Sequence, residues 1–319
     1  MKIAITARNF TTPDNRALEL LLENGFEIID HIDKNCGTAT PEEKVAEYIK
    51  GADAVITGLE PIGEKVFAAC PGLKLISRRG IGYDSVDIKA ARKHGIHVVR
   101  TAGAVEAAVS EHVMAYVLYF ARKLHEQSAF MHEGKWVRTM TYGAKNRTMG
   151  LVGFGGIGKE IAKRANAFGM KVIYTCRHPK EEWEQEFHTS YRTLEQLLKE
   201  SDYISVNVPL TEETRGMFQE EQFQLMKPES VFINIARGPI VNENAFKKAL
   251  DNKWIRGAGV DVFEFEPCTD SPLVSCENAV LTPHTAPFTS ENFSEMNLLA
   301  AKNVVDFFKG EIDRRYVLV

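Results

Sequence analysis

The sequence contains no long apolar segment, few cysteines and no large excess of charge of either sign. No apolar run approaches the roughly 20 residues that span a bilayer, and a strand is expected from Lys2 onward, so we expect neither a membrane segment nor a signal sequence. The five cysteines show no C-x-x-C spacing, which argues against a zinc ribbon or a disulfide framework, predicts no metal site and fits a cytoplasmic protein. A formal net charge of -4 gives no reason to expect a nucleic-acid partner.

The most informative segment runs from Thr148 to Arg177 and contains three glycines in a G-x-G-x-x-G pattern. An apolar strand is expected at Met149–Val152, a helix from Gly156, and a second strand at Lys171–Tyr174. This order of elements predicts the first β-α-β unit of a Rossmann-type dinucleotide-binding domain.

Each glycine of the pattern has its own expected task. Gly153 permits the tight turn out of the strand, Gly155 lets the backbone approach a pyrophosphate, and Gly158 lets the helix pack closely on the strand. The N–H groups at the start of the helix, those of Gly156 and Ile157, lie at the positive end of its dipole. We therefore expect them to face the phosphates of the cofactor.

The same glycines also fit most of a nucleotide triphosphate loop, G-x-x-x-x-G-K, from Gly153 to Lys159. That loop needs Ser or Thr next, to hold Mg²⁺, and this chain has Glu160. A carboxylate there would oppose a triphosphate, so the ATPase interpretation is rejected.

The residues after the second strand select the cofactor. A site for NAD usually has Asp or Glu there to accept hydrogen bonds from the ribose hydroxyls. This chain has Cys176 and Arg177, followed by His178 and Lys180. Because an arginine can bind a 2′-phosphate through a bidentate pair, we favour NADP over NAD. The alternative, that Arg177 is a solvated surface charge and the site accepts either cofactor, stays open.

The first hundred residues alternate between short apolar strands and amphipathic helices, which predicts a separate, doubly wound α/β domain with a parallel sheet. Strands are expected at Lys2–Thr6, Phe26–Asp30, Ala54–Thr57, Lys74–Ser77 and His97–Val99. Helices are expected at Asn15–Glu23, Pro41–Ile49 and Val86–His94, the last with Asp84 as its N-cap.

A long helix is expected over residues 101–123, followed by an exposed arm from Gln127 to Lys145 of a kind that commonly contacts a second subunit. The remaining elements are expected to be strands at Tyr203–Val206, Val231–Ile235, Arg256–Val262 and Ala279–Leu281 and a helix from Glu291 to Phe308.

Three polar residues follow the ends of the last strands: Arg237, Glu266 and His284. Strand ends are where an open α/β sheet binds its ligand. The three residue types suit the reduction of a 2-keto acid, because His supplies a proton, Glu orients the His, and Arg holds the carboxylate and polarises the carbonyl.

A second candidate segment is Ser77 to Asp84, where glycines follow a strand and expose N–H groups that can hold a small carboxylate. Arg78 and Arg79 would add a positive field. An ordinary loop with solvated arginines is an equally good interpretation of this segment.

Over essentially its whole length the sequence resembles the D-isomer-specific 2-hydroxyacid dehydrogenase family. The resemblance is carried by these motifs: Arg79-Gly80-Ile81-Gly82-Tyr83-Asp84, Gly153 to Gly158, Asn207-Val208-Pro209-Leu210-Thr211, Asn234-Ile235-Ala236-Arg237-Gly238, Asp261-Val262-Phe263 with Glu266-Pro267, and Pro283-His284-Thr285-Ala286.

The resemblance implies a hydride transfer between NAD(P)H and C2 of a small 2-keto or D-2-hydroxy acid. Arg237 would then be the substrate arginine, Glu266 the partner of the histidine and His284 the acid/base. The backbone at Ile81 and Gly82 would bind the substrate carboxylate. Further cofactor contacts would come from Asp261, which would bind the nicotinamide carboxamide, and from Pro209 and Thr214.

The resemblance also implies a Rossmann domain, residues 102–285, inserted in a flavodoxin-like substrate domain, residues 1–101 and 286–319. Family members usually form homodimers through the cofactor domain, which would give the arm at 126–146 a purpose. The Cys176-Arg177 pair resembles the NADP-preferring glyoxylate and hydroxypyruvate reductases. Asn207 replaces a histidine of many members, with no consequence that the sequence reveals.

Other functions on the same fold are weighed against this one. A D-3-phosphoglycerate dehydrogenase without its regulatory domain stays possible, although Glu60 stands in a segment where those enzymes usually carry an arginine. A formate dehydrogenase is disfavoured because it pairs its histidine with Gln. A dinucleotide-sensing corepressor would keep the fold and bind without turnover.

Overall fold

The computed structural model describes residues 1–30 and 36–319, and they form two units. One unit comprises Met1–Val105 and Pro287–Val319, and the other comprises Glu106–Ala286. The chain therefore leaves the first unit once and returns to it once. No helix in the described parts of the chain is both long and apolar enough to cross a membrane.

The described residues of the first unit form a parallel sheet of five strands in the order β2-β1-β3-β4-β5, an order found in flavodoxin-like folds. The strands are β1 (Lys2–Ile5), β2 (Glu27–Asp30), β3 (Ala54–Thr57), β4 (Leu75–Arg78) and β5 (His97–Arg100). The helices are α1 (Arg16–Glu23), α2 (Glu42–Ile49), α3 (Glu64–Ala69), α4 (Ile88–Lys93) and α12 (Ser290–Lys309).

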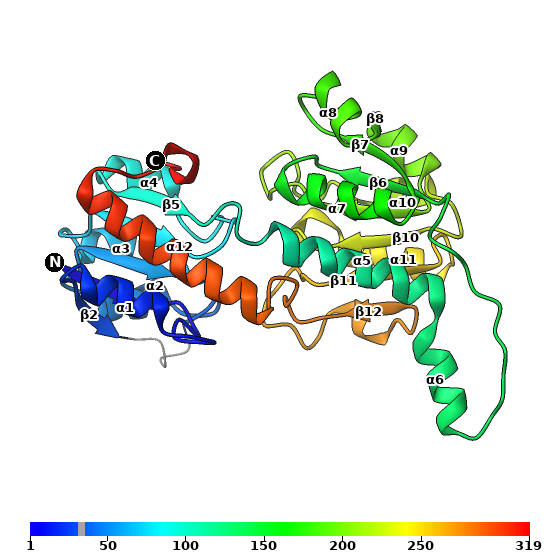
Figure 1. Cartoon of the computed structure of the whole chain (residues 1–319), viewed down its shortest axis with the longest axis horizontal. Coiled ribbons are helices and arrows are strands. Elements are labelled where there is room, and N and C mark those ends of the chain that lie inside the picture. The colour runs from blue at the N-terminus through cyan, green and yellow to red at the C-terminus, as the bar shows by residue number, and fades with distance from the viewer. Residues whose placement is uncertain (31–35) are drawn as a thin grey trace. The chain divides into compact units, whose positions relative to one another are not determined.

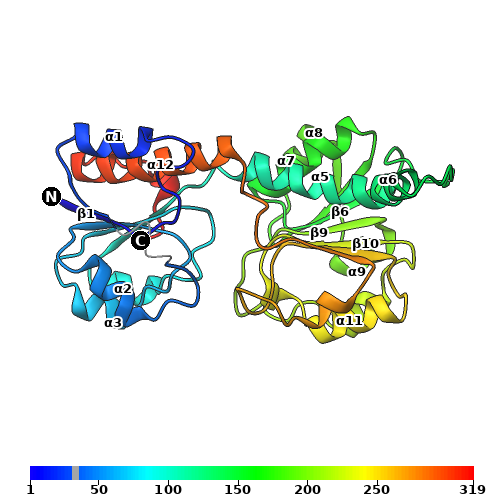
Figure 2. The same cartoon turned by 90° about the horizontal axis from the view of Figure 1, so that it is seen from below.

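Helices cover both faces of this sheet (Figure 1; Figure 2). On one face, α1 and α12 pack over Ile3, Ile5 and Ile56. On the other, α2, α3 and α4 enclose Val55 and Ile76. Because both faces are buried, the strands are apolar almost throughout, as expected for a parallel sheet. The predicted doubly wound domain is thus confirmed.

The second unit, all of whose residues are described, has seven parallel strands in the order β12-β11-β10-β9-β6-β7-β8. The strands are β6 (Thr148–Val152), β7 (Lys171–Thr175), β8 (Thr189–Tyr191), β9 (Tyr203–Val206), β10 (Val231–Asn234), β11 (Gly257–Val260) and β12 (Ala279–Leu281). The strand order reverses between β6 and β9, and such a switch point is where α/β sheets of this kind bind ligands. The Rossmann-type prediction is confirmed.

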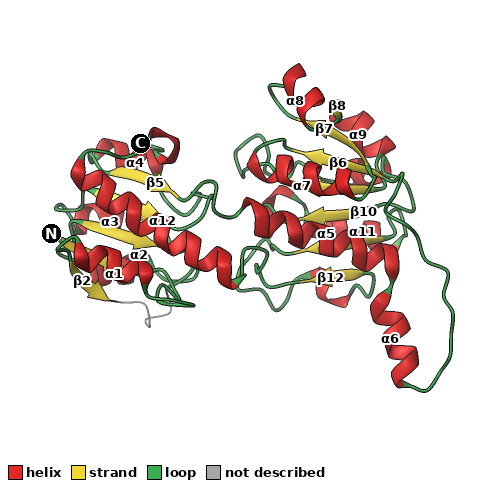
Figure 3. Ribbon diagram, in the orientation of Figure 1, coloured by secondary structure: helices red, strands yellow, loops and turns green. Residues whose placement is uncertain are grey.

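Helices flank this sheet as well (Figure 3). They are α5 (Glu106–Arg122), α6 (Leu124–His132), α7 (Gly156–Ala167), α8 (Glu181–Glu186), α9 (Leu194–Glu200), α10 (Glu220–Gln224) and α11 (Glu243–Asp251). Helix α5 packs on α7 and against β10 and β11. On the opposite face, α9, α10 and α11 close over a core rich in phenylalanine, including Phe218, Phe223, Phe232 and Phe246.

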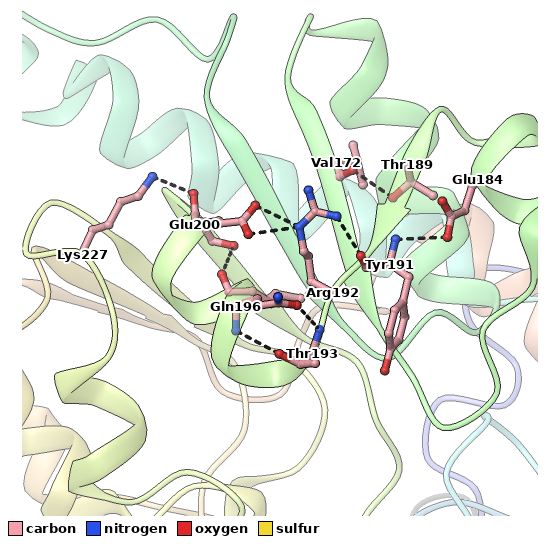
Figure 4. Close-up of polar contacts among 11 residues, drawn as sticks. Val172, Glu184, Thr189, Tyr191, Arg192, Thr193, Gln196, Glu200 and Lys227 are labelled. Atoms are coloured by element: carbon pink, nitrogen blue, oxygen red, sulfur yellow. Dashed lines mark hydrogen bonds and ion pairs between the residues drawn. The ribbon is translucent and has the colours of Figure 1, made fainter.

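Strand β8 was not predicted, because only three residues form it and they carry no apolar repeat. Figure 4 shows what fixes it: the Thr189 hydroxyl donates to the Val172 carbonyl at 3.0 Å, and the Tyr191 N–H donates to Glu184 at 3.2 Å. The next residue, Arg192, donates through Nε to both carboxylate oxygens of Glu200 at 3.0 Å. The sheet therefore extends one strand beyond the sequence-based expectation.

Two helix starts differ from the predictions. The helix expected over 101–123 begins at Glu106, since Gly103 adopts a φ of 94° that an α-helix excludes. Asp84 does not cap α4: the helix begins at Ile88, and the Asp87 side chain accepts from the Ala90 N–H. The arm is preceded and partly formed by α6, which buries none of its residues and so shows no apolar periodicity.

Candidate active site

The turn after β6 contains three glycines, of which two allow close packing and one borders open space. Gly153 has a φ of 100°, and a Cβ there would lie 2.9 Å from the carbonyl carbon of Asn207. A Cβ at Gly158 would lie 2.5 Å from the Gly153 carbonyl oxygen. A Cβ at Gly155 would meet nothing within 4 Å. Gly153 and Gly158 therefore permit close packing, while the backbone at Gly155 borders free space, as a pyrophosphate would require.

The start of α7 supplies N–H donors to the same space. The first N–H groups of a helix have no intrahelical acceptor, and Gly155 at the N-cap has no side chain to provide one. The Glu106 side chain lies against Gly156, with Oε1 2.9 Å from where a Cβ would be. No sequence motif indicates this carboxylate. The residues of the turn fit a dinucleotide, with Glu106 as a charged neighbour.

The loop after β7, with Cys176 and Arg177, lies near the loop that holds Pro209 and Thr214. The Thr214 hydroxyl donates to the Pro209 carbonyl at 2.6 Å and so closes the second loop. Glu213 in that loop has a lowered pKa, chiefly through the Thr211 hydroxyl and its own backbone, with a smaller contribution from the charge of Arg177. Arg177 itself is exposed.

Arg237, Glu266 and His284 follow β10, β11 and β12, which are neighbours in the sheet. The carboxyl ends of parallel strands share one edge, so the three residues come together as the sequence predicted. His284 Nδ1 lies 2.7 Å from Glu266 Oε2, and each of these side chains is about one-fifth exposed, at 21% and 20%. The pairing leaves Nε2 of His284 as the nitrogen available to a substrate.

The pKa of Glu266 is lowered although the residue is largely buried. Burial acts to raise this pKa, but the hydrogen bond to His284 and the His284 charge act against it, helped by the Phe263 N–H and the charge of Arg237. The carboxylate is therefore ionised near neutral pH. An ionised partner at Nδ1 fixes the orientation of the imidazole.

Gly238, which follows Arg237, and Glu243 hold the Glu266 loop in place. A Cβ at Gly238 would lie 1.9 Å from the carbonyl carbon of Phe263, so the loop carrying Arg237 contacts the loop carrying Glu266 backbone to backbone. The buried Glu243 accepts the Glu264 N–H at 2.8 Å and the Ser271 hydroxyl at 2.6 Å. Contacts this distant in sequence carry no local signal.

Asp261 is fully buried, at 0% exposed, and its carboxylate accepts three hydrogen bonds. The donors are the Thr282 hydroxyl at 2.6 Å, the Thr285 N–H at 2.8 Å and the Ala286 N–H at 2.9 Å. A nicotinamide carboxamide would be a fourth donor. The role expected for Asp261 at the cofactor thus stays a prediction, beside an observed role in holding the His284 loop.

Asn207 has a structural explanation. Its side chain donates to the Ser205 carbonyl at 3.0 Å and accepts the Ser205 hydroxyl at 2.9 Å. Its backbone fills the space left by the missing Cβ of Gly153. Asn207 therefore shapes the turn on which the cofactor would lie.

In the first unit, the loop with Ile81 and Gly82 follows β4. Gly80, with a φ of 129°, donates its N–H to the Thr101 hydroxyl at 2.7 Å, and Arg100 donates to the Ile81 carbonyl at 3.3 Å. Among residues 1–30 and 36–319, no hydrogen bond comes from the N–H of Ile81 or Gly82. These two donors fit the binding of a carboxylate.

Neither neighbouring arginine is a solvated charge. Arg79 donates to the Arg8 carbonyl at 2.6 Å and to Asn297 at 3.0 Å, and its guanidinium lies 4.9 Å from the ring centre of Phe293. Burial lowers the pKa of Arg79 to about 10. Arg78 is buried and contacts the Arg79 carbonyl. Arg79 thus ties the loop to α12, which corrects the interpretation of both residues as solvated.

Comparison with known proteins matches the fold and the family that the sequence motifs indicate. The model of the NAD-binding domain of the D-isomer-specific 2-hydroxyacid dehydrogenases matches residues 114–286. A glyoxylate reductase of Thermococcus litoralis is 40% identical over 304 residues, which cover 91% of this chain and 92% of that protein.

Two solved structures superpose over 100% of this chain. The acyclic imino acid reductase Bsp5, in complex with NADPH and D-Arg, has a TM-score of 0.88 at 26% identity and is covered fully. The D-lactate dehydrogenase of Aquifex aeolicus, with NAD and lactic acid, has a TM-score of 0.86 at 27% identity and is covered over 99%.

Fold, site and matches together define an oxidoreductase that uses a nicotinamide dinucleotide and acts on a small 2-hydroxy or 2-keto acid. The chain belongs to the D-isomer-specific 2-hydroxyacid dehydrogenase family.

Proposed function

We propose that this enzyme reduces glyoxylate and hydroxypyruvate, with NADPH as the preferred cofactor and His284 as the proton donor. The observation that carries the proposal is the pair of His284 Nδ1 and Glu266 Oε2, 2.7 Å apart, with Arg237 near enough to lower the pKa of Glu266. The 40% identity to a glyoxylate reductase supports the choice of substrate.

When bound, the reduced nicotinamide supplies the hydride that reaches C2 of the keto acid. Glu266 holds the imidazole so that Nε2 of His284 gives its proton to the carbonyl oxygen. Arg237 stabilises the charge that develops on the oxygen. In the first unit, the N–H groups of Ile81 and Gly82 are the donors that the family resemblance assigns to the substrate carboxylate. Residues 1–101 and 286–319 are thus the substrate-binding domain, and residues 102–285 bind the dinucleotide and also carry Arg237, Glu266 and His284.

The phosphates would lie on Gly155, Gly156 and Ile157. The preference for NADPH rests on the loop after β7, which offers Arg177, His178 and Lys180 and no carboxylate at the ribose position. Fold similarity does not decide this point, because Bsp5 is in complex with NADPH and the Aquifex enzyme with NAD. Glu213 near Arg177 would weaken the attraction for a phosphate without cancelling it.

The test is the initial rate of glyoxylate reduction with NADPH and with NADH, in the wild type and in Arg177→Ala. We expect the wild type to prefer NADPH and the variant to lose that preference by a rise of about 10-fold or more in KM for NADPH, as loss of a charge-assisted pair implies. Lys199→Ala, which removes an exposed charge of α9 that pairs with Glu195, is the matched control. An equal preference in Arg177→Ala and wild type would refute the phosphate role.

A second copy of the chain is proposed to cover the arm, as a homodimer of the cofactor unit. Large apolar side chains are exposed there, above all Trp136 at 77% and Met140 at 92%. A Trp136→Ser, Met140→Ser variant is expected to sediment as a monomer at concentrations where the wild type is a dimer. Val274→Ser, at a valine outside the arm that is 58% exposed, is the control. A monomeric wild type would refute the proposal.

The phosphoglycerate alternative finds no support in the first unit. It needs Arg78 and Arg79 to meet a second anionic group, whereas Arg79 is engaged by Arg8 and Asn297. The buried Glu60, which accepts the Gly58 N–H at 3.0 Å, adds a negative charge to the same region.

A further inference from the structure

Two side chains of α5 reach the strand end that carries His284. The Tyr116 hydroxyl lies 2.6 Å from the Thr282 hydroxyl, and His112 Nε2 lies 3.2 Å from it. The His112 ring stands edge-on to the Tyr116 ring at 4.8 Å. The Thr282 hydroxyl in turn lies 2.6 Å from Asp261 Oδ1. These four residues form one polar chain between α5 and the loop after β12.

The direction of each hydrogen bond follows from the count of donors. Asp261 is a carboxylate that already accepts two backbone N–H groups, so the single hydroxyl proton of Thr282 is donated to it. The oxygen of Thr282 then accepts from both Tyr116 and His112. Burial raises the pKa of Tyr116, which keeps its hydroxyl protonated as a donor. Both acceptor positions of the Thr282 oxygen are therefore filled.

This chain of hydrogen bonds ends at the backbone that carries His284. His284 has a φ of 53°, a left-handed conformation that a residue with a Cβ rarely adopts. Its N–H donates to the Asp261 carbonyl at 2.8 Å, and the next two N–H groups, of Thr285 and Ala286, donate to the Asp261 carboxylate. Successive N–H groups thus form a concave anion site that Asp261 fills. A shift of Asp261 would relax the loop and move the imidazole.

We propose that Thr282, Tyr116 and His112 are positioning residues for the reaction: they fix the Asp261 carboxylate, which holds the His284 loop in its left-handed conformation. The inference rests on the proposed role of His284 as proton donor. It assigns α5, which carries no residue of the glycine turn or of the Arg237-Glu266-His284 trio, a direct part in the geometry of proton transfer.

The test compares Thr282→Val, which keeps the shape and removes the hydroxyl, with Thr282→Ser, which keeps the hydroxyl. We expect Thr282→Val to lower kcat by roughly 10- to 100-fold, the range for a small misplacement of a reacting group. Thr282→Ser should restore most of kcat. Tyr116→Phe should show a smaller loss in the same direction, because His112 still donates to Thr282.

The matched control is Tyr119→Phe, the same change on the same helix at a tyrosine that stacks on His125 outside the chain of hydrogen bonds. The ring nitrogen shifts of His284 in ¹⁵N NMR spectra should change in Thr282→Val and Tyr116→Phe and stay constant in Tyr119→Phe. A merely structural effect would lower thermal stability without changing those shifts. If Thr282→Val does not fold, Tyr116→Phe carries the test.

A kcat for Thr282→Val within twofold of wild type would overturn the inference, as would equal losses in Thr282→Val and Thr282→Ser. Unchanged His284 shifts in a folded Tyr116→Phe would also overturn it. His284→Ala separates this failure from that of the proposed function. An inactive His284→Ala with a normal Thr282→Val refutes the positioning role alone, whereas an active His284→Ala refutes the proton-donor role itself.

Discussion

Both units turn out of a parallel strand through a glycine with positive φ, Gly80 in one and Gly153 in the other, yet the backbone that follows differs between the two turns. After Gly153 the chain enters the 12-residue helix α7 at Gly156, which gives the turn a helix dipole and a row of N–H groups. After Gly80 no helix begins until Ile88. The turn at Gly153 suits a pyrophosphate. The turn at Gly80 offers only a few N–H donors, enough for one carboxylate.

The side chains at the two sheet edges differ in the same way. In the second unit, Glu266 and His284 are paired and partly exposed, so they are available for chemistry. In the first unit, the Arg79 guanidinium donates hydrogen bonds to the Arg8 carbonyl and to Asn297. We infer that the second unit carries the cofactor, the proton donor and the substrate arginine Arg237, whereas the first unit supplies only N–H donors for the acid. Variants in the two units should therefore affect different kinetic constants.

The largest effect on this contrast is expected from Glu266→Gln. The amide cannot stabilise a charged imidazole as a carboxylate does, so kcat for glyoxylate reduction should fall by about 100-fold, at the low end of general acid–base contributions. The KM for NADPH should be unchanged. Steady-state rates beside Glu264→Gln, an exposed neighbour, provide the measurement and its control. Equal kcat in the two variants would place the chemistry elsewhere.

In the glycine turn of the second unit, one glycine serves packing and another serves cofactor binding. Gly158→Ala places a Cβ 2.5 Å from a carbonyl oxygen and should lower the free energy of unfolding by about 1–3 kcal/mol. Gly155→Ala meets no neighbour, so it should leave stability unchanged and weaken NADPH binding. Urea unfolding and titration of NADPH fluorescence measure the two effects. Equal stability losses would contradict the division.

In the first unit, Thr101→Val should raise the KM for glyoxylate by about 2- to 10-fold, the value of one hydrogen bond. The change deprives the Gly80 N–H of its acceptor and loosens the loop with Ile81 and Gly82. Neither kcat nor the KM for NADPH should change. Thr57→Val is the control, because the buried Thr57 hydroxyl has no partner among the described residues. A fall in kcat with no change in the KM for glyoxylate would contradict the assignment of different roles to the two units.

The smallest effect concerns acid stability. The pKa of Glu266 is lowered from its usual 4.5, so the ionised form is favoured in the folded chain. Its stabilising contribution is therefore complete above pH 4.5 and is lost as the pH falls through the lowered pKa. The difference in urea midpoint between wild type and Glu266→Gln should shrink from pH 6 toward acid. A difference in urea midpoint that grows toward acid pH would contradict this prediction.

The sequence was sufficient wherever a local pattern encodes the structure. The turn from Gly153 to Gly158 and the polar ends of three successive strands are visible as motifs, because parallel strands bring their carboxyl ends together. The short strand β8 and the helix α6 were missed, since neither carries an apolar period.

The supports of the site could not be predicted at all. The contact of His112 with Thr282 joins residues 170 positions apart, and the packing of Gly238 on Phe263 depends on how two loops meet. Nothing in the neighbouring residues signals either contact. The contact of Arg79 could not be predicted for the same reason, because its partner Asn297 belongs to α12, near the other end of the chain.

The most direct test of the account is glyoxylate reduction by wild type and His284→Ala, followed by loss of the NADPH absorbance, with NADPH affinity measured on the same samples. We predict turnover in the wild type, a fall in kcat of about 10²- to 10⁴-fold in the variant, the usual contribution of a general acid, and unchanged affinity. Near-normal turnover in His284→Ala, or none in the wild type with either cofactor, would contradict it.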